Sequence, residues 1–247
     1  MFLEDFRNKK RLGQNFIYDL AFLDGIVNKL GLTQTDTVVE VGAGTGTLTK
    51  CLAKRVGWVI TYEIDTELEP VLKENLKEFN NIEFRFQDVM DAKDFPSKFK
   101  LVANIPYYIT TPLIMKFLRE RRCSEICILV QEDVAYRIVA VPNTKDYGAL
   151  SVTCQAFADC KIIKKVRRGM FHPAPSVDSA FIVLKKHEQY YYLPNFDDLL
   201  KTVFSKRRKK ISNSVDIKLL KKCNIDPNLR PENLTVEQFV KLSQTFS

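Results

Sequence analysis

The feature that most constrains the fold is an alternation of short β-branched runs with longer segments whose apolar residues recur at helical spacing. A buried strand is apolar throughout, whereas a helix that covers a sheet shows an apolar stripe every three to four residues. The pattern predicts strands over 37–41, 58–62 (ending at Glu63), 82–86, 101–103 and 126–130, and helices over 17–30, 47–54 and 65–79. This order of elements is typical of an α/β fold, in which a mostly parallel sheet carries helices on both faces.

The later part of the chain departs from this alternation. Two extended runs, 161–166 and 179–185, follow each other without a long helix between them, so we expect them to pair antiparallel at the sheet edge. Every earlier strand precedes a segment that can form a helix, and Thr111-Pro112 has the residue types of an N-cap and first helical turn. We place a boundary at 186–194. It separates a domain over 1–186, which includes an N-terminal arm, from a small helical domain over 187–247 with helices over 196–205, 217–223 and 236–246.

Composition excludes several classes of protein. Of the 247 residues, 45% are hydrophobic, which is enough to bury a core and excludes global disorder. No stretch approaches the roughly 18 to 20 apolar residues of a membrane span, and residues 1–12 resemble neither a secretory signal nor a transit peptide. We therefore expect a cytoplasmic protein that does not bind membranes. The six cysteines form no Cys-x-x-Cys pair and there are two histidines, so we expect reduced thiols and no metal site.

The charge is basic and clustered. Lys and Arg number 38 against 30 Asp and Glu, a formal net charge of +8. The densest run, Lys206-Arg207-Arg208-Lys209-Lys210, lies in the small domain, and further clusters lie at 9–11 and 161–168. Such runs also occur on ordinary solvated surfaces, but several of them in one basic chain favour a polyanionic partner such as a nucleic acid.

A glycine-rich turn follows the first predicted strand, with glycine at positions 42, 44 and 46. Between a strand and a helix, such a turn lets backbone N–H groups approach a ligand closely. Dinucleotide folds need a third glycine where Thr47 stands, and no lysine follows at phosphate-loop spacing. An ordinary tight turn is the alternative interpretation. The pattern Glu40-Val-Gly-Ala-Gly-Thr-Gly resembles the first motif of class I methyltransferases that use S-adenosylmethionine.

Acidic residues stand at the ends of the next two predicted strands. Glu63 is placed to accept hydrogen bonds from both hydroxyls of a ribose. Asp88 is placed to accept from an adenine amino group, while the N–H of Val89 reaches a ring nitrogen. Each acid alone could be a surface or capping residue. Because the ends of neighbouring parallel strands meet at one edge of a sheet, the combination predicts a nucleoside site.

A reactive motif, Asn104-Ile105-Pro106-Tyr107, follows the fourth predicted strand. The Asn104 carboxamide and the Ile105 carbonyl offer two acceptors, Pro106 stiffens the turn, and Tyr107 presents a flat ring. Two acceptors aimed at the hydrogens of an aromatic amine, with its base stacked on Tyr107, would favour pyramidal nitrogen and direct its lone pair toward a methyl donor. A proline turn that merely follows a strand is the alternative interpretation.

Together with Gly13-Gln14-Asn15-Phe16-Ile17 near the N-terminus and the segment 171–180 (Phe-His-Pro-Ala-Pro-Ser-Val-Asp-Ser-Ala), these motifs resemble the ribosomal RNA adenine N6,N6-dimethyltransferase family. The resemblance implies a Rossmann-like class I methyltransferase sheet with a small helical C-terminal domain, and S-adenosylmethionine as cofactor. It implies methyl transfer to N6 of two adjacent adenosines near the 3′ end of small-subunit ribosomal RNA during ribosome biogenesis. The implied partner is ribosomal RNA within a small-subunit precursor, and the implied enzyme is a monomer.

Carried over by position, the resemblance implies roles for individual residues. Asn104, Ile105, Pro106 and Tyr107 would form the base pocket, with Phe171 as its other wall. Position 15 is often histidine in the family, so the side-chain role of Asn15 is the least constrained. The implied cofactor contacts are Asn15, Ile17, Gly42, Gly44, Gly46, Glu63, Asp88, Val89 and Asn104, and we assign RNA binding to Lys206, Arg207, Arg208, Lys209 and Lys210.

Three other functions fit parts of this pattern. The antibiotic-resistance methyltransferases that act on large-subunit RNA share the glycine loop and the Asn-Ile-Pro-Tyr motif, but Thr111-Pro112 and 177–180 look more like the small-subunit enzymes. A non-catalytic assembly or transcription factor could keep the fold, although every expected catalytic position is intact. Protein-glutamine methyltransferases resemble an Asn-Pro-Pro-Tyr pattern and do not require a basic tail.

Overall fold

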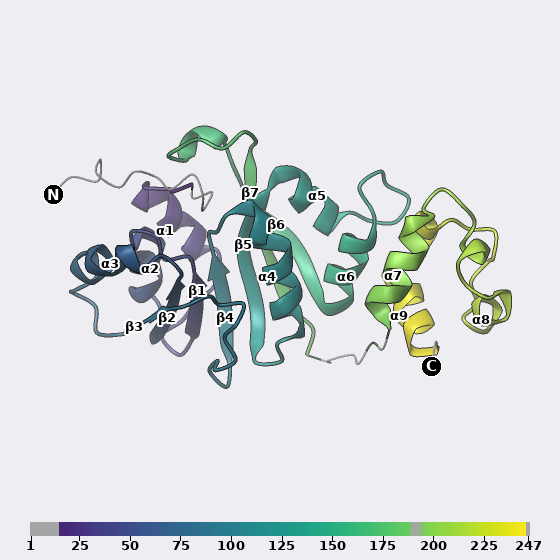
Figure 1. Ribbon diagram of the computed structural model, residues 1–247, viewed down its shortest axis with the longest axis horizontal. Helices are drawn as coiled ribbons and strands as arrows, with labels where there is room; N and C mark the ends of the chain where they lie inside the picture. Colours follow the sequence, from purple (N-terminus) through teal and green to yellow (C-terminus); the bar gives the residue numbers. More distant parts are fainter. Residues whose placement is uncertain (1–14, 189–192, 194, 246–247) are drawn as a thin grey trace. The chain divides into compact units, whose positions relative to one another are not determined.

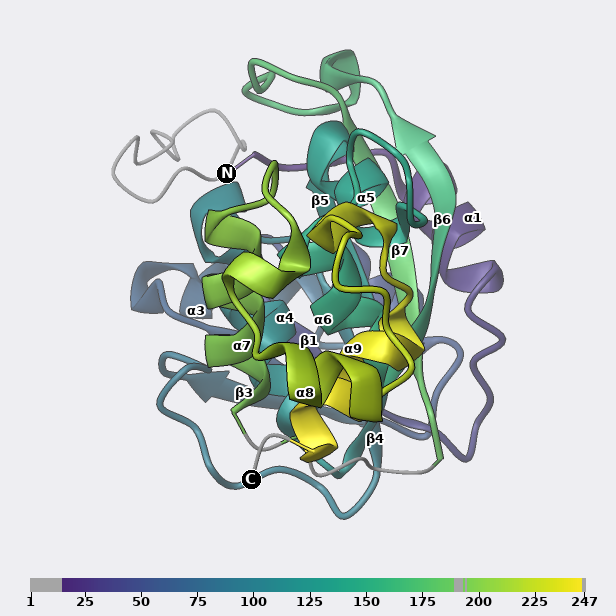
Figure 2. The ribbon, with the colours of Figure 1, turned by 90° about the vertical axis from the view of Figure 1, so that its right-hand side faces the viewer.

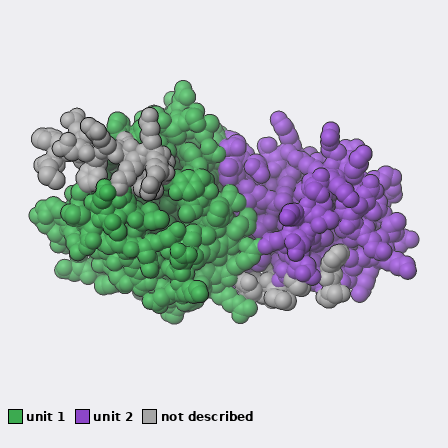
Figure 3. Space-filling view, in the orientation of Figure 1, with its two compact units in different colours: residues 1–132, 162–185 green, residues 133–161, 186–247 purple. Residues whose placement is uncertain are grey.

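The computed structural model describes residues 15–188, 193 and 195–245, and the N-terminal arm with the basic run 9–11, Gly13 and Gln14 lies outside them. The chain divides into two compact units, one over 1–132 and 162–185 and the other over 133–161 and 186–247 (Figure 3). This division differs from the predicted domains in one segment, since 133–161 groups with the C-terminal residues. The reason is packing, because helix α6 (Ala149–Phe157) in this segment contacts α7 (Phe196–Ser205) and α9 (Val236–Thr245).

The sheet has seven strands in the order β3-β2-β1-β4-β5-β7-β6 (Figure 1). Neighbours among β1 to β5 pair parallel, and β7 pairs antiparallel with β5, so that Gln131 lies opposite Ser179. The strand order reverses between β1 and β4, which is where open α/β sheets bind ligands. The strands are β1 (Thr37–Val41), β2 (Trp58–Glu63), β3 (Ile82–Phe86), β4 (Phe99–Ala103), β5 (Cys123–Gln131), β6 (Ala158–Val166) and β7 (Ser179–Lys186).

Helices cover both faces of this sheet. On one face, α1 (Leu20–Asn28) and α2 (Thr47–Ala53) share a buried cluster with strand residues such as Val38, Val102 and Leu129. Helix α1 lies beside the edge strand β6 (Figure 2), where Lys29 Nζ donates to the Ile163 carbonyl over 3.2 Å. On the other face, the fully buried Phe117 of α4 (Tyr107–Arg119) packs edge-on against Phe95 and Phe99, with ring centroids 5.3 and 6.0 Å away. Burial on both faces explains why the central strands are mostly apolar.

Two predicted helix starts differ from the structure. Helix α1 begins at Leu20 rather than at 17, because the Asp19 side chain accepts from the Phe22 N–H over 2.9 Å and caps the helix there. The prediction that Thr111-Pro112 starts a helix is wrong. Helix α4 begins at Tyr107, directly after Pro106, and Pro112 lies inside it. Pro112 has no N–H to donate to the carbonyl of Tyr108. Because Tyr108 is exposed in the first turn of the helix, water can reach this carbonyl.

The predicted helix over 65–79 is shorter and divided. A 3-10 turn, η3 (Thr66–Leu68), precedes α3 (Glu69–Asn75). Pro70 lies in the first turn of α3, where its missing N–H would have no partner within the helix.

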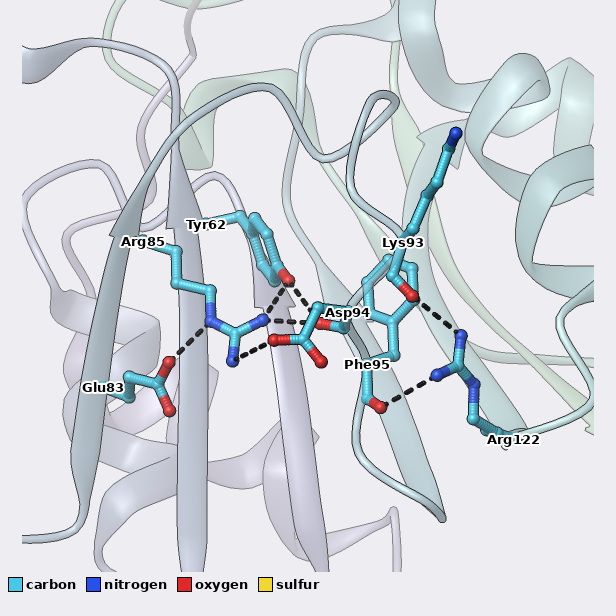
Figure 4. A network of polar contacts seen from close by, with 7 residues as sticks. All are labelled: Tyr62, Glu83, Arg85, Lys93, Asp94, Phe95 and Arg122. Atoms are coloured by element: carbon cyan, nitrogen blue, oxygen red, sulfur yellow. Dashed lines mark hydrogen bonds and ion pairs between the residues drawn. The ribbon is translucent and has the colours of Figure 1, made fainter.

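The connection between β3 and β4, residues 87–98, contains no helix, although we expected a helix-forming segment after this strand. Side chains from elsewhere pair with its carbonyl groups instead (Figure 4). The Asp94 carbonyl accepts from Arg85 at 2.6 Å and from the Tyr62 hydroxyl at 3.3 Å. Arg122 donates to the carbonyls of Phe95 and Lys93 at 3.0 and 3.1 Å. A segment whose carbonyls are paired in this way needs no helical hydrogen bonds.

The second unit is helical around an aromatic core. Phe204 packs against Phe239 with ring centroids 5.5 Å apart, and the buried Tyr147 donates its hydroxyl to the Leu234 carbonyl over 2.9 Å. The predicted helices over 196–205 and 217–223 correspond to α7 and α8 (Ile217–Lys222), and the one over 236–246 corresponds to α9. The remaining elements are α5 (Glu132–Val139), η5 (Ile211–Asn213) and η6 (Pro231–Asn233), and η4 (Arg168–Met170) belongs to the first unit.

Candidate cofactor pocket and reactive loop

A pocket in the first unit lies where β1, β2 and β4 end, and most of the predicted site residues line it. Neighbouring parallel strands place these residues together, although they are distant in sequence. The predicted residues in the lining are Asn15, Ile17, Gly42, Gly44, Glu63, Asp88, Val89, Asn104, Ile105 and Pro106. Gly46, Tyr107 and Phe171 are not part of it.

The glycine turn approaches its neighbours too closely to carry side chains. A Cβ on Gly42 would lie 2.9 Å from Cγ2 of Ile105, and one on Gly44 would lie 2.8 Å from Cε1 of Phe16. Both glycines have positive φ, +79° and +58°, which other residues rarely adopt. The turn therefore brings its backbone against the reactive loop and keeps the pocket open. Gly46 instead caps α2 beside Leu76.

Glu63 is 4% exposed and holds the glycine turn. Its Oε2 accepts from the Gly44 N–H and its Oε1 from the Asp65 N–H, each over 2.9 Å. Burial raises the pKa of Glu63, and these hydrogen bonds oppose that shift because they favour the carboxylate. The side chain is thus fixed at the pocket wall with its position set by backbone groups.

The turn at Asp88 is held by two sets of contacts. Within the turn, Asp88 Oδ1 accepts from the Met90 N–H over 2.8 Å. From α4, Lys116 Nζ donates to the carbonyls of Met90 and Ala92 over 2.7 and 2.9 Å. The helix that begins at the reactive loop therefore also fixes the turn that carries Asp88 and the buried Val89.

In the reactive loop, Asn104, Ile105 and Pro106 face the pocket. The half-buried Tyr107 follows, and its hydroxyl shares a 2.7 Å hydrogen bond with Oγ of Ser179 at the start of β7. Burial raises the pKa of Tyr107, so its hydroxyl stays protonated. The hydrogen bond fixes the ring relative to the sheet, and the role of Tyr107 in stacking stays a prediction.

Phe171 lies in the core, 5% exposed, in the same cluster as α1 and α2. Its neighbour His172 forms an antiparallel bridge with Phe16, in which Phe16 N–H donates over 3.0 Å and His172 N–H over 2.8 Å. The bridge joins the N-terminal signature to the late motif. Core packing accounts for Phe171, and its predicted place in the base pocket stays a prediction.

Sequence reasoning missed several residues in the lining. Phe16 covers Gly44, Ile64 follows Glu63 and is 57% exposed, and Tyr108 follows the reactive motif and is 70% exposed. Each stands next to a predicted site residue, and that adjacency was the available signal.

The basic run 206–210 lies in the second unit, and its members differ in their contacts. Arg207 Nε pairs with Glu232 over 2.8 Å, and its guanidinium also donates to the carbonyls of Thr144 and Lys145. This arginine therefore links three segments of its own unit. The other four side chains of the run are exposed: Lys206, Arg208, Lys209 and Lys210.

Two features are absent from the part of the chain that the structure describes. In residues 15–188, 193 and 195–245, no group of three or more His, Cys, Asp and Glu side chains is placed to hold a metal ion. Over the same ranges, no helix combines the length and apolarity needed to cross a bilayer.

Comparisons with known proteins agree with this geometry. The Ribosomal RNA small subunit methyltransferase A of Clostridioides difficile (strain 630) is 41% identical over 262 residues, which cover 97% of this chain and 91% of that protein. A dimethyladenosine transferase from Plasmodium falciparum has a crystal structure similar to this one with a TM-score of 0.84 and 27% identity, covering 94% of this chain and 97% of that one. The 23S rRNA methyltransferase ErmE has a TM-score of 0.75 and 26% identity, covering 94% and 99%.

These likenesses confirm the predicted class I methyltransferase fold with its antiparallel edge. A family model described as Ribosomal RNA adenine dimethylase matches residues 5–247. The match spans both units and includes the glycine turn, the reactive loop and the basic run. On these grounds the chain belongs to the ribosomal RNA adenine dimethylase family.

Proposed function

We propose that this protein transfers methyl groups from S-adenosylmethionine to the N6 amino group of adenosines in small-subunit ribosomal RNA, and that it dimethylates two adjacent adenosines near the 3′ end. The observation that carries the proposal is the single pocket in which the glycine turn, Glu63 and Asp88 face Asn104 and Ile105. The proposal includes a small-subunit precursor as substrate, a monomeric enzyme and a cytoplasmic location.

The residues of the pocket fit S-adenosylmethionine. The bare backbone at Gly42 and Gly44, where a Cβ would collide with its neighbours, leaves room for the methionine part of the cofactor beside the turn. Glu63 is an acceptor for ribose hydroxyls, and Asp88 with the Val89 N–H suits an adenine. When bound, the cofactor supplies an electrophilic methyl group on a sulfonium centre.

The reactive loop supplies acceptors for the target amine. The N6 amine of adenine is a poor nucleophile because its lone pair is delocalised into the ring. The Asn104 carboxamide oxygen and the Ile105 carbonyl accept its two hydrogens, which favours pyramidal nitrogen and localises the lone pair. The Tyr107 ring, held through Ser179, offers a stacking face for the base. No ionised base is needed at the transfer step.

Dimethylation sets one further requirement. After the first transfer the amine keeps one hydrogen, which Asn104 or Ile105 can still accept. Duplex RNA hides the N6 atom, so the target base has to be unstacked or flipped. Nucleoside mass spectrometry tests this part of the proposal, because monomethyladenosine that persists with excess enzyme and cofactor would contradict it.

A second candidate function is adenine methylation of large-subunit RNA, which the likeness to ErmE favours. The greater identity to a protein named for the small subunit, 41% against 26%, supports the small subunit. The test is to incubate purified protein and labelled S-adenosylmethionine with undermethylated small and large subunits separately, and then to map the labelled nucleosides. We expect label in small-subunit adenosines. Label in the large subunit alone would support the second candidate, and no label in either would support a non-catalytic factor.

A further inference from the structure

A row of aromatic rings runs from the cofactor pocket to the surface of the first unit. Phe16 lies in the pocket against Gly44. The Tyr18 ring stacks on Phe16 with centroids 5.9 Å apart and an interplanar angle of 30°, and the His172 ring lies 6.4 Å from Tyr18. Tyr18 is 39% exposed and His172 is exposed. The outer two rings are therefore exposed next to Phe16, which lines the pocket.

Backbone contacts hold these rings in place. The two hydrogen bonds between Phe16 and His172, 3.0 and 2.8 Å long, join segments that are far apart in sequence. Between Phe16 and Tyr18, the side chain of Ile17 is 3% exposed and anchors the segment in the core. A surface ring fixed from both sides loses little conformational entropy when it binds a flat ligand.

Cations precede His172 on the same loop. Arg167 and Arg168 are exposed, and the loop that carries them projects from the sheet between β6 and β7 (Figure 1). The Arg168 N–H donates to Asp178 Oδ1 over 2.8 Å, which fixes the loop through its backbone and leaves the guanidinium group out of that contact. Lys165 on β6 pairs with Glu132 over 3.0 Å, so its charge is partly compensated.

We propose that Tyr18 and His172 form a stacking surface for the single-stranded RNA next to the target adenosine, and that Arg167 and Arg168 bind the phosphates of that RNA. The proposal rests on the proposed function, since it names the surface by which the substrate strand reaches the pocket. Exposed rings beside exposed arginines are the combination with which proteins bind single strands, because every base has a flat face and every nucleotide carries a phosphate. An acidic peptide would use the arginines but would not need the rings.

The first experiment removes the rings. Tyr18→Leu and His172→Leu keep apolar bulk without an aromatic face, and Tyr18→Phe keeps the ring. Trp58→Leu is the matched control, because Trp58 is 40% exposed, like Tyr18, but begins β2 at the opposite end of the strand from the pocket. We expect Tyr18→Leu and His172→Leu each to raise KM for undermethylated small subunits roughly 5-fold or more. We expect Tyr18→Phe and Trp58→Leu to match the wild type.

Calorimetry with S-adenosylmethionine separates this role from cofactor binding. We expect the dissociation constants of the Tyr18 and His172 variants to stay within about 2-fold of the wild type. If Tyr18→Leu weakens cofactor binding as much as it raises KM for the RNA substrate, Tyr18 acts through Phe16 on the pocket, and the proposal is wrong. If Tyr18→Leu behaves like Trp58→Leu, the surface does not contact RNA.

The second experiment removes the cations. The double variant Arg167→Gln with Arg168→Gln should flatten the salt dependence of binding to a single-stranded adenine-rich RNA, since each lost phosphate contact lowers the slope by about 0.7. The ring variants should weaken binding without changing the slope. Lys73→Gln with Lys77→Gln is the control, because both lysines are exposed cations on and after α3. An unchanged slope in the arginine variant would overturn the phosphate contacts.

These outcomes are distinguishable from a failure of the proposed function. If the wild type binds the RNA but transfers no methyl group to either subunit, the proposed function fails. The RNA-binding measurements on the ring and arginine variants then still test whether this surface contacts RNA. If transfer to the small subunit occurs and the ring variants leave KM unchanged, the surface fails alone.

Discussion

The backbone amide of Gly44 donates a 2.9 Å hydrogen bond to Oε2 of Glu63. This bond connects the turn after β1 to the end of β2, whose strands pair parallel so that Val41 lies opposite Tyr62. Glu63 therefore has two tasks, since it shapes the glycine turn and also lines the pocket as an acceptor. One substitution should affect both.

We expect Glu63→Ala to weaken S-adenosylmethionine binding roughly 10- to 150-fold, since a lost hydrogen bond to a charged group costs about 1.5 to 3 kcal/mol. Isothermal calorimetry on the folded variant measures this change. Glu63→Gln is the matched variant, because its amide oxygen can still accept from Gly44, and it should retain part of the affinity. A folded alanine variant with wild-type affinity would remove Glu63 from the site.

The reactive loop should separate chemistry from binding. We expect Asn104→Ala and Tyr107→Ala to lose most of their turnover while they keep the fold and much of the RNA affinity, because their side chains orient the amine and its base. Tyr107→Phe keeps the ring and loses only the bond to Ser179, so its kcat should fall less. Single-turnover rates with saturating RNA and cofactor measure the effect, and near wild-type rates in both alanine variants would show that the pocket is misplaced.

Glu40 should make stability depend on pH. It is fully buried on β1, its Oε2 accepts from Thr49 Oγ1 over 2.6 Å, and its Oε1 has no hydrogen-bond partner among the described residues. Burial raises the pKa of Glu40 to about 7, and the nearby hydroxyls of Thr49 and Thr61 oppose the shift. A protonated Glu40 can donate to the buried hydroxyl of Thr61, its neighbour across the β1–β2 pair.

The sign of the pH dependence follows from proton uptake. Between the pKa of an unfolded glutamate, roughly 4.3, and a folded pKa of about 7, the folded protein holds a proton that the unfolded chain has lost. The free energy of unfolding should therefore fall as the pH rises through this window, by roughly 4 kcal/mol in all, and then level off. Urea unfolding of the wild type and of Glu40→Gln measures it. The variant should lack this component, and parallel profiles would contradict the assignment.

Lys116 should tune adenine recognition without touching the cofactor. Lys116→Met removes both hydrogen bonds to the carbonyls of the turn that carries Asp88, whereas Lys116→Arg can restore them. We expect Lys116→Met to reduce the preference for S-adenosylhomocysteine over its deaminated analogue S-inosylhomocysteine by about 2- to 10-fold. Competition binding with the two nucleosides measures the preference. Equal weakening of both ligands would mean that Lys116 only stabilises the fold.

The basic run in the second unit should contribute phosphate contacts. Replacing Lys206, Arg208, Lys209 and Lys210 with glutamine, with Arg207 retained, should weaken RNA binding and flatten its salt dependence. Arg207→Gln is the contrasting variant, because it breaks the contacts with Glu232, Thr144 and Lys145 and should lower stability by about 1 kcal/mol. Salt titrations of RNA binding and urea unfolding check the two expectations. A quadruple variant with an unchanged slope would mean that these four residues are ordinary solvated surface.

Much of this protein follows from local sequence. Strands β1 to β5 follow from short runs rich in β-branched and other apolar residues. The bends at Gly42 and Gly44 follow from the glycines, because other residues rarely adopt the positive φ of these positions. The position of the pocket follows too, because neighbouring parallel strands have their carboxyl ends on the same side of the sheet. The family motifs added the role of the reactive loop, which periodicity alone does not give.

The tertiary structure decided what depends on contacts between distant residues. The carbonyls of the connection after β3 pair with the side chains of Arg122 and Lys116 rather than within a helix. The same reason applies to the bridge from Phe16 to His172 and to the pairing of Arg207 with Glu232. Each partner is distant in sequence, so no local pattern encodes the contact, and only the closed fold brings the two groups within hydrogen-bonding distance.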